Sequence, residues 1–211
     1  MTTAPRIARP RPASSAALGR VLGRAATLRR DPAEKCDLCA NPVADGHAHV
    51  LDERRDELLC ACRACALLFE RDAAGRGHYR LVPRRRVRLD GVPSADLGVP
   101  VGLAFFVREP DGGVAARCPS PAGATRWEVD PPVWAAAEAR CEALRTMLPG
   151  VEALLVNTAR GADEQWLVPV DDCHRLVAAV RRSWKGLSGG LEVWPEIERF
   201  FAELATNPEG K

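Results

Sequence analysis

The sequence predicts an α+β protein: a small zinc-ribbon or treble-clef-like module with four cysteine ligands, followed by an antiparallel-sheet domain with three helices. Two Cys-x-x-Cys pairs lie close together in the front half of the chain. Several segments of the back half have the apolar pattern and the turn boundaries of strands. Three other segments there have the length and the end signals of helices. A small metal module in front of a mixed domain follows from these three observations.

Changes in composition divide the 211 residues into five segments. Residues 1–32 form a basic tail that is expected to be disordered or partly helical. Residues 33–75 form a Cys-rich metal-binding module, and residues 76–90 form a basic connecting strand. Residues 91–206 form the α+β domain, and residues 207–211 form a short tail. A chain of this length has room for one ordinary domain with a small module attached.

Charge is divided unevenly along the chain. Residues 1–90 carry 18 basic and 11 acidic side chains, whereas residues 91–211 carry 12 basic and 17 acidic ones. A basic front half could bind nucleic acid, an anionic membrane or an acidic partner protein. Four arginines lie among residues 84–88, but we expect them on an exposed strand where their charge is solvated. Nucleic-acid binding is therefore a weaker hypothesis than protein binding.

The sequence has no apolar run near the ~20 residues that a membrane-spanning helix needs. Its N-terminus lacks the apolar core of a secretory signal. We therefore expect a cytoplasmic protein. In that compartment clustered cysteines are expected to bind metal rather than to form disulfides.

Two hairpins are predicted in the back half. The first joins "VGLAFFVRE" to "VAARC" through the turn "PDGG", and the second joins "VEALLVNT" to "EQWLVPV" through "ARGAD". The stretch "PSPAGAT" is rich in turn formers and is predicted to be a loop. Helices are expected over residues 131–148, 172–184 and 192–204. Asp130 is a suitable N-cap for the first of them, and Asp171 or Asp172 for the second.

The strongest functional signal is a pair of cysteine knuckles. A Cys-x-x-Cys turn places two thiolates on one side of the chain, each about 2.3 Å from a shared ion. The two turns are 22 residues apart, which leaves room for a hairpin that folds them face to face. The sequence therefore predicts tetrahedral coordination of one structural zinc ion by Cys36, Cys39, Cys62 and Cys65.

Three neighbouring residues are alternates for this site. Cys60 lies two residues before Cys62, and His47 shares a strand face with His49. Together with the four knuckle thiols they would suffice for a second metal or an iron–sulfur cluster. The favoured interpretation is simpler: the histidines are surface or hydrogen-bonding residues, and Cys60 is a small buried side chain.

Four thiolates suit zinc, a rubredoxin-type iron or an iron–sulfur cluster. Many ribbon-type sites have glycine after each knuckle, but here Ala40 and Ala66 occupy those positions. The absence of glycine at these positions favours a treble-clef-like zinc module, in which the second cysteine pair lies at the start of a helix. A zinc ion held by four cysteines has no open coordination position, so it organises a surface rather than activating water.

Nothing in the sequence argues for an enzyme. It contains no phosphate-binding loop, serine elbow, paired-carboxylate motif or dinucleotide fingerprint. Cys173 and His174 are neighbours on a predicted helix and therefore point in different directions. We interpret Cys173, Cys118 and Cys141 as packing residues.

The motifs "CDLC", "LLCACRACALLF", "LAFF", "PSPAGAT", "VEALLVN", "WLVPVDDCHRLV" and "WKGLSGG" occur in this order. In that order they resemble an uncharacterised actinobacterial family, a domain of unknown function encoded beside the subunits of high-affinity nickel–iron hydrogenases. The resemblance covers roughly residues 33–206. It implies a cytoplasmic accessory protein for hydrogenase assembly, or a small partner of that enzyme, and it transfers no catalytic residue.

Three functional hypotheses follow. The first is a non-enzymatic zinc protein that docks on a protein partner, with hydrogenase subunits implied by the resemblance. The second is an electron carrier that holds iron or an iron–sulfur cluster and works with a hydrogenase. The third is a zinc protein that binds nucleic acid through the basic front half.

Overall fold

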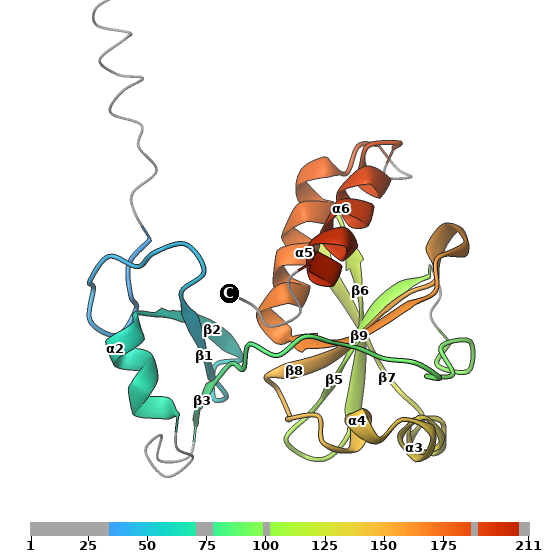
Figure 1. Cartoon of the computed structure of the whole chain (residues 1–211), viewed down its shortest axis with the longest axis horizontal. Coiled ribbons are helices and arrows are strands. Elements are labelled where there is room, and N and C mark those ends of the chain that lie inside the picture. The colour runs from blue at the N-terminus through green and yellow to red at the C-terminus, as the bar shows by residue number, and fades with distance from the viewer. Residues whose placement is uncertain (1–33, 71–77, 99–101, 187–189, 207–211) are drawn as a thin grey trace, which may run out of the picture. The chain divides into compact units, whose positions relative to one another are not determined.

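The structure is a computed structural model and describes residues 34–70, 78–98, 102–186 and 190–206 (Figure 1). The tails predicted at residues 1–32 and 207–211 lie outside these residues. The described residues from Lys35 onward belong to one compact unit. This unit contains antiparallel sheets together with helices, which confirms the predicted α+β class.

The cysteine module contains the predicted hairpin and one further strand. Its elements are β1 (Ala48–Asp52), β2 (Glu57–Ala61), the short helix α2 (Arg63–Ala66), the 3-10 turn η1 (Leu67–Phe69) and β3 (Tyr79–Leu81). The strands form an antiparallel sheet in the order β2-β1-β3. Among the described residues, only three buried side chains form the cluster inside this sheet, those of Val50, Ala61 and Ala66. So small a core does not by itself stabilise a module of this size.

The second sheet has six antiparallel strands in the order β4-β9-β8-β5-β6-β7. They are β4 (Val87–Arg88), β5 (Leu103–Arg108), β6 (Val114–Ser120), β7 (Gly123–Glu128), β8 (Glu152–Asn157) and β9 (Glu164–Pro169). Both predicted hairpins are confirmed, β5 with β6 and β8 with β9. The two hairpins join along β5 and β8 and so place the most apolar strands in the middle of the sheet.

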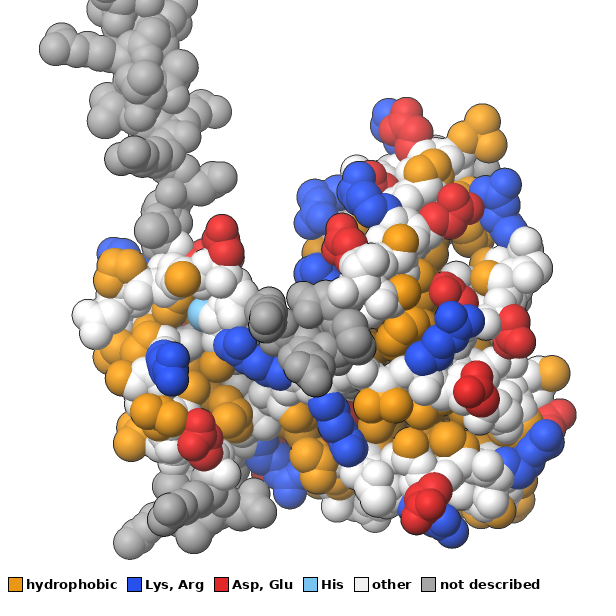
Figure 2. Space-filling model, in the orientation of Figure 1, with side chains coloured by type: hydrophobic (Ala, Val, Ile, Leu, Met, Phe, Trp, Pro, Cys, Tyr) orange, Lys and Arg blue, Asp and Glu red, His pale blue; other side chains and the backbone are white. Residues whose placement is uncertain are grey.

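Helices cover both faces of this sheet (Figure 1). They are α3 (Pro131–Arg140), α4 (Glu142–Arg145), α5 (Val170–Ser183) and α6 (Val193–Thr206). Successive residues of a strand point to opposite faces, so β5 supplies both cores. Phe105 packs in the core under α5 and α6, and Phe106 packs in the core under α3 and α4. Acidic and basic side chains alternate over the outer surfaces of α5 and α6 (Figure 2).

The cysteine module shares a core with the large sheet. Leu51 of β1 and Val82, just after β3, are buried in the cluster that also contains Val168 and Leu176. Gly150 has a φ of +74°, and a Cβ atom there would lie 2.9 Å from the Leu51 Cδ2 atom. The positive φ, together with this close approach, explains why a glycine occupies this turn. Module and sheet therefore pack as one unit, and groups far apart in the sequence can meet between them.

The prediction that the arginines of residues 84–88 lie on a solvated strand holds for Arg88, on the edge strand β4, but is wrong for Arg85 and Arg86. Only Val87 and Arg88 form a strand there. Arg85 donates to both carboxylate oxygens of Glu152, whose side chain is fully buried. Arg86 binds Asp172, which is also buried, in the same two-pronged way. Both arginines are bound to carboxylates of the fold because a buried carboxylate requires a charged partner.

Three further predictions differ from the structure. The expected loop at residues 119–125 is a tight hairpin turn, and β7 begins inside it and pairs with β6. The helix expected over residues 131–148 is interrupted at Cys141, whose backbone is extended. Helix α5 begins at Val170 after Pro169, so Asp171 and Asp172 lie in its first turn and do not cap it. By contrast, Asp130 does occupy the N-cap position of α3, as predicted.

Candidate metal centre

Backbone hydrogen bonds build the first cysteine knuckle. The N–H of Cys36 donates to the carbonyl of Asn41, and the N–H of Ala40 donates to the carbonyl of Cys36, both at 2.8 Å. Asp37 ties this turn to β2 twice. Its N–H donates to the carbonyl of Cys60 at 2.9 Å, and its Oδ2 atom accepts from the Cys60 N–H at 2.6 Å. The knuckle is therefore held against the strand that leads into the second cysteine pair.

The second knuckle opens a helix. Cys62 occupies the N-cap position of α2, and the N–H of Ala66 donates to the Cys62 carbonyl at 2.9 Å. Cys65 lies within the helix, so helical geometry sets the direction of its side chain. A knuckle at a loop followed by a pair at the start of a helix is the arrangement expected for a treble-clef-like module.

The four predicted ligands come together. The sulfur atoms of Cys36, Cys39, Cys62 and Cys65 all lie within 4.8 Å of one another. The Cys39 and Cys62 sulfurs are 3.7 Å apart. Bonds of about 2.3 Å to one tetrahedral ion would place two ligand sulfurs about 3.8 Å apart. The site therefore fits a single metal ion. In an iron–sulfur cluster the four thiolates are divided among two or four iron atoms, and thiolates on different irons lie further apart, so the spacing favours a mononuclear site.

The thiols of this site change one another's acidity. Burial opposes ionisation of Cys36, but hydrogen bonds from the backbone of Cys62 and of its own knuckle lower the pKa of Cys36 to about 6. Hydrogen bonds with the thiols of Cys39 and Cys62 raise the pKa of Cys65 to about 12. One thiol therefore ionises readily, while its neighbours resist further negative charge. A divalent cation among the four sulfurs would remove this conflict.

Ala40 has a φ of +59°, in the left-handed region that favours glycine, whereas Ala66 has a helical φ of −59°. We expect Ala40→Gly to raise the free energy of unfolding by up to about 1 kcal/mol, because the relief of strain exceeds the added flexibility of the unfolded chain. Ala66→Gly should lower it by about 1 kcal/mol. Urea denaturation of both zinc-loaded variants checks the pair. A loss of stability in Ala40→Gly would contradict the argument from strain.

The three alternates form a separate group. The ligand atoms of His47, His49 and Cys60 also lie within 4.8 Å of one another. Both histidines are hydrogen-bonded through Nδ1, His47 to the carbonyl of Ala44 at 3.1 Å and His49 to the Oδ2 atom of Asp171 at 2.8 Å. None of the three belongs to the four-sulfur group. Cys60 is half-buried, which makes it more accessible than the predicted packing role requires.

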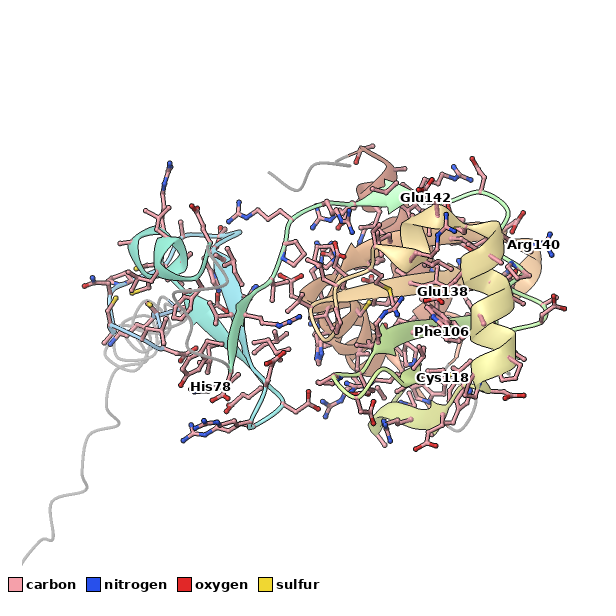
Figure 3. The ribbon with its side chains drawn as sticks, turned by 90° about the horizontal axis from the view of Figure 1, so that it is seen from below. His78, Phe106, Cys118, Glu138, Arg140 and Glu142 are labelled. Carbon is pink, nitrogen blue, oxygen red and sulfur yellow. The ribbon has the colours of Figure 1, made fainter. Side chains whose placement is uncertain are left out.

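The cysteines outside the module behave as packing residues. Cys118, Cys141 and Cys173 are all buried. Figure 3 shows Cys118 in the large sheet, where its thiol donates to the carbonyl of Leu103 at 3.2 Å. Burial raises the pKa of Cys118 and of Cys173, which keeps both thiols protonated and unreactive. His174, beside Cys173, is exposed, so the two side chains do point in different directions as predicted.

Asp171 is the site residue that sequence reasoning assigned to the wrong role. It was expected to cap a helix, but it binds a histidine 122 positions away. Because the two residues are so far apart in the sequence, no local sequence pattern predicts their contact. One signal was available in the sequence: two adjacent acidic residues follow the strand "EQWLVPV". A helix cap requires only one of them, so the other was free for a different role.

Comparison with protein families gives a match over residues 35–208, to a family described as being of unknown function, DUF5947. No curated protein matches the chain, and no solved structure matches it. Among the described residues, none of the helices combines the length and the apolar character that crossing a bilayer requires.

Proposed function

Because the chain belongs to DUF5947, a family of unknown function, we propose its role from its own metal centre and surface. The proposed function is that of a cytoplasmic, non-enzymatic zinc-binding accessory protein. Cys36, Cys39, Cys62 and Cys65 hold one structural zinc ion, and the module that this ion stabilises docks on a larger protein.

The observation that carries the proposal is the spacing of the four sulfurs. They lie within 4.8 Å of one another, and the separation of the Cys39 and Cys62 sulfurs matches the edge of a tetrahedral zinc–thiolate site. Bound there, zinc supplies a cross-link between the two knuckles. Four protein ligands fill its coordination sphere, so no position is left for a reacting water molecule. This argument favours a structural role over a catalytic one.

The surface of the module supports docking. Leu67 and Leu68 follow the second knuckle directly and are 54% and 60% exposed. Leu38, inside the first knuckle, is also exposed. Figure 2 shows hydrophobic side chains gathered over the part of the molecule that carries α2. Exposed apolar side chains grouped on one element are typical of protein-binding surfaces. Because the metal sets the positions of both knuckles, it would also set the shape of this surface.

The partner in this proposal is a nickel–iron hydrogenase subunit or its precursor, as the sequence resemblance implies. The test measures the binding of purified hydrogenase and of its large-subunit precursor to the zinc-loaded protein. Leu67→Arg with Leu68→Arg should weaken binding at least about 10-fold, a loss of about 1.4 kcal/mol. Leu191→Arg, at an exposed leucine outside the module, is the matched control and should bind normally. No binding by the wild type would refute the partner. Equal binding by all variants would refute the docking surface at Leu67 and Leu68.

A second candidate is an electron carrier with a rubredoxin-type iron at the same four sulfurs. The mononuclear spacing that suits zinc also suits a single iron ion. Elemental analysis and a visible absorption spectrum of anaerobically purified protein separate the two. After dialysis removes weakly bound metal, we expect about one zinc per chain and no colour. Stoichiometric iron with visible absorption would replace the zinc proposal with the redox one.

The nucleic-acid hypothesis finds less support. It rests on the basic front half of the chain, and two of the arginines there, Arg85 and Arg86, bind buried carboxylates of the protein itself. Guanidinium groups engaged in this way are not available to phosphate groups.

A further inference from the structure

The register of the β1–β2 hairpin brings His47, His49 and Cys60 together. His49 and Cys60 are directly opposite each other in the antiparallel pair. Directly opposite side chains share a face of the sheet and lie close enough to contact one another. His47 precedes His49 by two residues, and the two imidazole rings are 4.7 Å apart between centroids. Potential ligand atoms of all three residues lie within 4.8 Å of one another.

The hydrogen bonds of both histidines set their tautomers. A backbone carbonyl only accepts, so the Nδ1 atom of His47 carries the proton that it shares with Ala44. The Asp171 carboxylate likewise accepts from Nδ1 of His49 at 2.8 Å. In a neutral imidazole this leaves the Nε2 atom of each ring with a lone pair. Histidines that bind metals characteristically donate their other nitrogen to a carboxylate or a carbonyl, as both do here.

Hydrogen bonds also fix Asp171 and the turn that precedes His47. The Oδ1 atom of Asp171 accepts from the N–H of Asp172 at 2.9 Å, in the first turn of α5. The guanidinium of Arg84 donates to the carbonyl of Gly46 at 2.9 Å and so holds the turn before His47. The positions of both imidazole rings are therefore set by groups from three parts of the fold.

The donor set is that of a transition-metal site. Two neutral imidazoles and one thiolate carry a single negative charge, which a divalent ion neutralises. Nitrogen and sulfur donors suit zinc, cobalt, nickel or copper and do not suit magnesium or calcium. Three protein ligands leave a tetrahedral ion one open position. A pocket of about 280 Å³ lies beside both histidines, with Arg86, Asp171 and Arg175 also in its lining. A water molecule or a small ligand could fill the open position from this pocket.

We propose that His47, His49 and Cys60 form a second metal site, separate from the four-cysteine centre, that takes a divalent transition-metal ion and keeps one coordination position open. Asp171 is its positioning residue, since it orients His49 without touching the metal. With three ligands rather than four, this site exchanges its ion more readily than the structural centre. The proposal goes beyond the docking role and does not depend on it.

The first test counts metal ions. Protein dialysed against buffered micromolar free Zn²⁺ should hold two zinc ions per chain, of which a competing chelator removes one readily. The variants His49→Gln and Cys60→Ser should hold one, and it should be the ion that resists the chelator. His78→Gln, at another histidine of the module, is the matched control and should hold two (Figure 3). One ion per chain in the wild type, or a second ion retained by both variants, would overturn the proposal.

The second test uses Co²⁺ as a spectroscopic probe and changes no ligand. Asp171→Asn keeps the size of the side chain but loses the charge that fixes His49. It should weaken cobalt binding at the second site about 10- to 100-fold, while the four-cysteine centre binds as before. Asp163→Asn, at an acidic residue whose bond is to Gln165, should leave both affinities unchanged. Equal cobalt affinity in Asp171→Asn and the wild type would remove Asp171 from the site.

Separate variants test the structural centre and the second site independently. Loss of the chelator-resistant ion in a Cys65→Ser variant reports on the structural zinc of the proposed function. Loss of the exchangeable ion in His49→Gln reports on the second site alone. Hydrogen exchange of the β1 and β2 amides shows in each variant whether the hairpin that carries the ligands is still folded.

Discussion

Replacing Cys39 or Cys65 by serine is expected to release the structural zinc ion and to unfold the cysteine module. The cluster inside the module's own sheet, among the described residues, consists of Val50, Ala61 and Ala66, while Leu51 and Val82 pack into the core of the large sheet. The module's own cluster is too small to hold three strands and a short helix together. In zinc-finger peptides a structural ion contributes an apparent binding free energy of about 10–16 kcal/mol. Loss of one of four thiolate ligands should therefore remove most of what stabilises the fold of residues 34–70.

Hydrogen exchange and elemental analysis measure the two parts of this result. The amides of β1 and β2 should lose protection in Cys39→Ser and Cys65→Ser, and the chelator-resistant zinc should disappear. The amides of β5 and β8, in the centre of the large sheet, should stay protected because two apolar cores enclose them. Cys60→Ser is the matched variant and should keep both the resistant ion and the fold of the hairpin. Loss of the resistant ion in Cys60→Ser as well would make Cys60 a ligand of the structural centre.

Replacing Arg85 by methionine is expected to destabilise the protein by about 3 kcal/mol. Its guanidinium binds both carboxylate oxygens of Glu152, which is fully buried and also accepts from the N–H of Leu148 at 2.8 Å. Removing one partner of a buried ion pair leaves an uncompensated charge and costs about 3–5 kcal/mol. We expect the lower end of that range because the Arg85 side chain is 44% exposed, so water can reach the cavity that it leaves.

Urea denaturation of the zinc-loaded protein measures this effect. Arg88→Met, at an exposed arginine three positions along the chain, is the control and should change the free energy of unfolding by no more than about 0.5 kcal/mol. The double variant Arg85→Met with Glu152→Gln should recover part of the loss, since no buried charge remains. If Arg85→Met and Arg88→Met have equal effects, the Glu152 carboxylate does not depend on Arg85.

Features with a local pattern were predicted from the sequence alone. The two hairpins of the large sheet follow from apolar runs bounded by turn formers. The hairpin between the cysteine pairs follows from the 22 residues that separate the two knuckles. The grouping of Cys36, Cys39, Cys62 and Cys65 follows from their spacing. In each case the residues that decide the structure lie within a few positions of one another, or on two adjacent strands.

Strand β7 and the break at Cys141 were missed because their local patterns favoured other structures. The stretch "PSPAGAT" consists mostly of small residues and turn formers, and it becomes part of a hairpin because β6 offers a free edge. The helical pattern over residues 131–148 continues through Cys141, but the backbone of Cys141 is extended between α3 and α4. Its buried side chain packs in the same core as Leu144 of α4. Tertiary packing overrode local propensity at both places.

The sequence by itself determined that this chain has a four-thiol centre and an α+β domain, because both depend on spacing and hydrophobic periodicity. Only the tertiary structure decided the roles of the charged residues. It paired Arg85 with Glu152 and Arg86 with Asp172, and it brought Asp171 to His49 across 122 positions. Which charged residues pair depends on their distance in space and on their burial, and neither can be predicted from the order of residues along the chain.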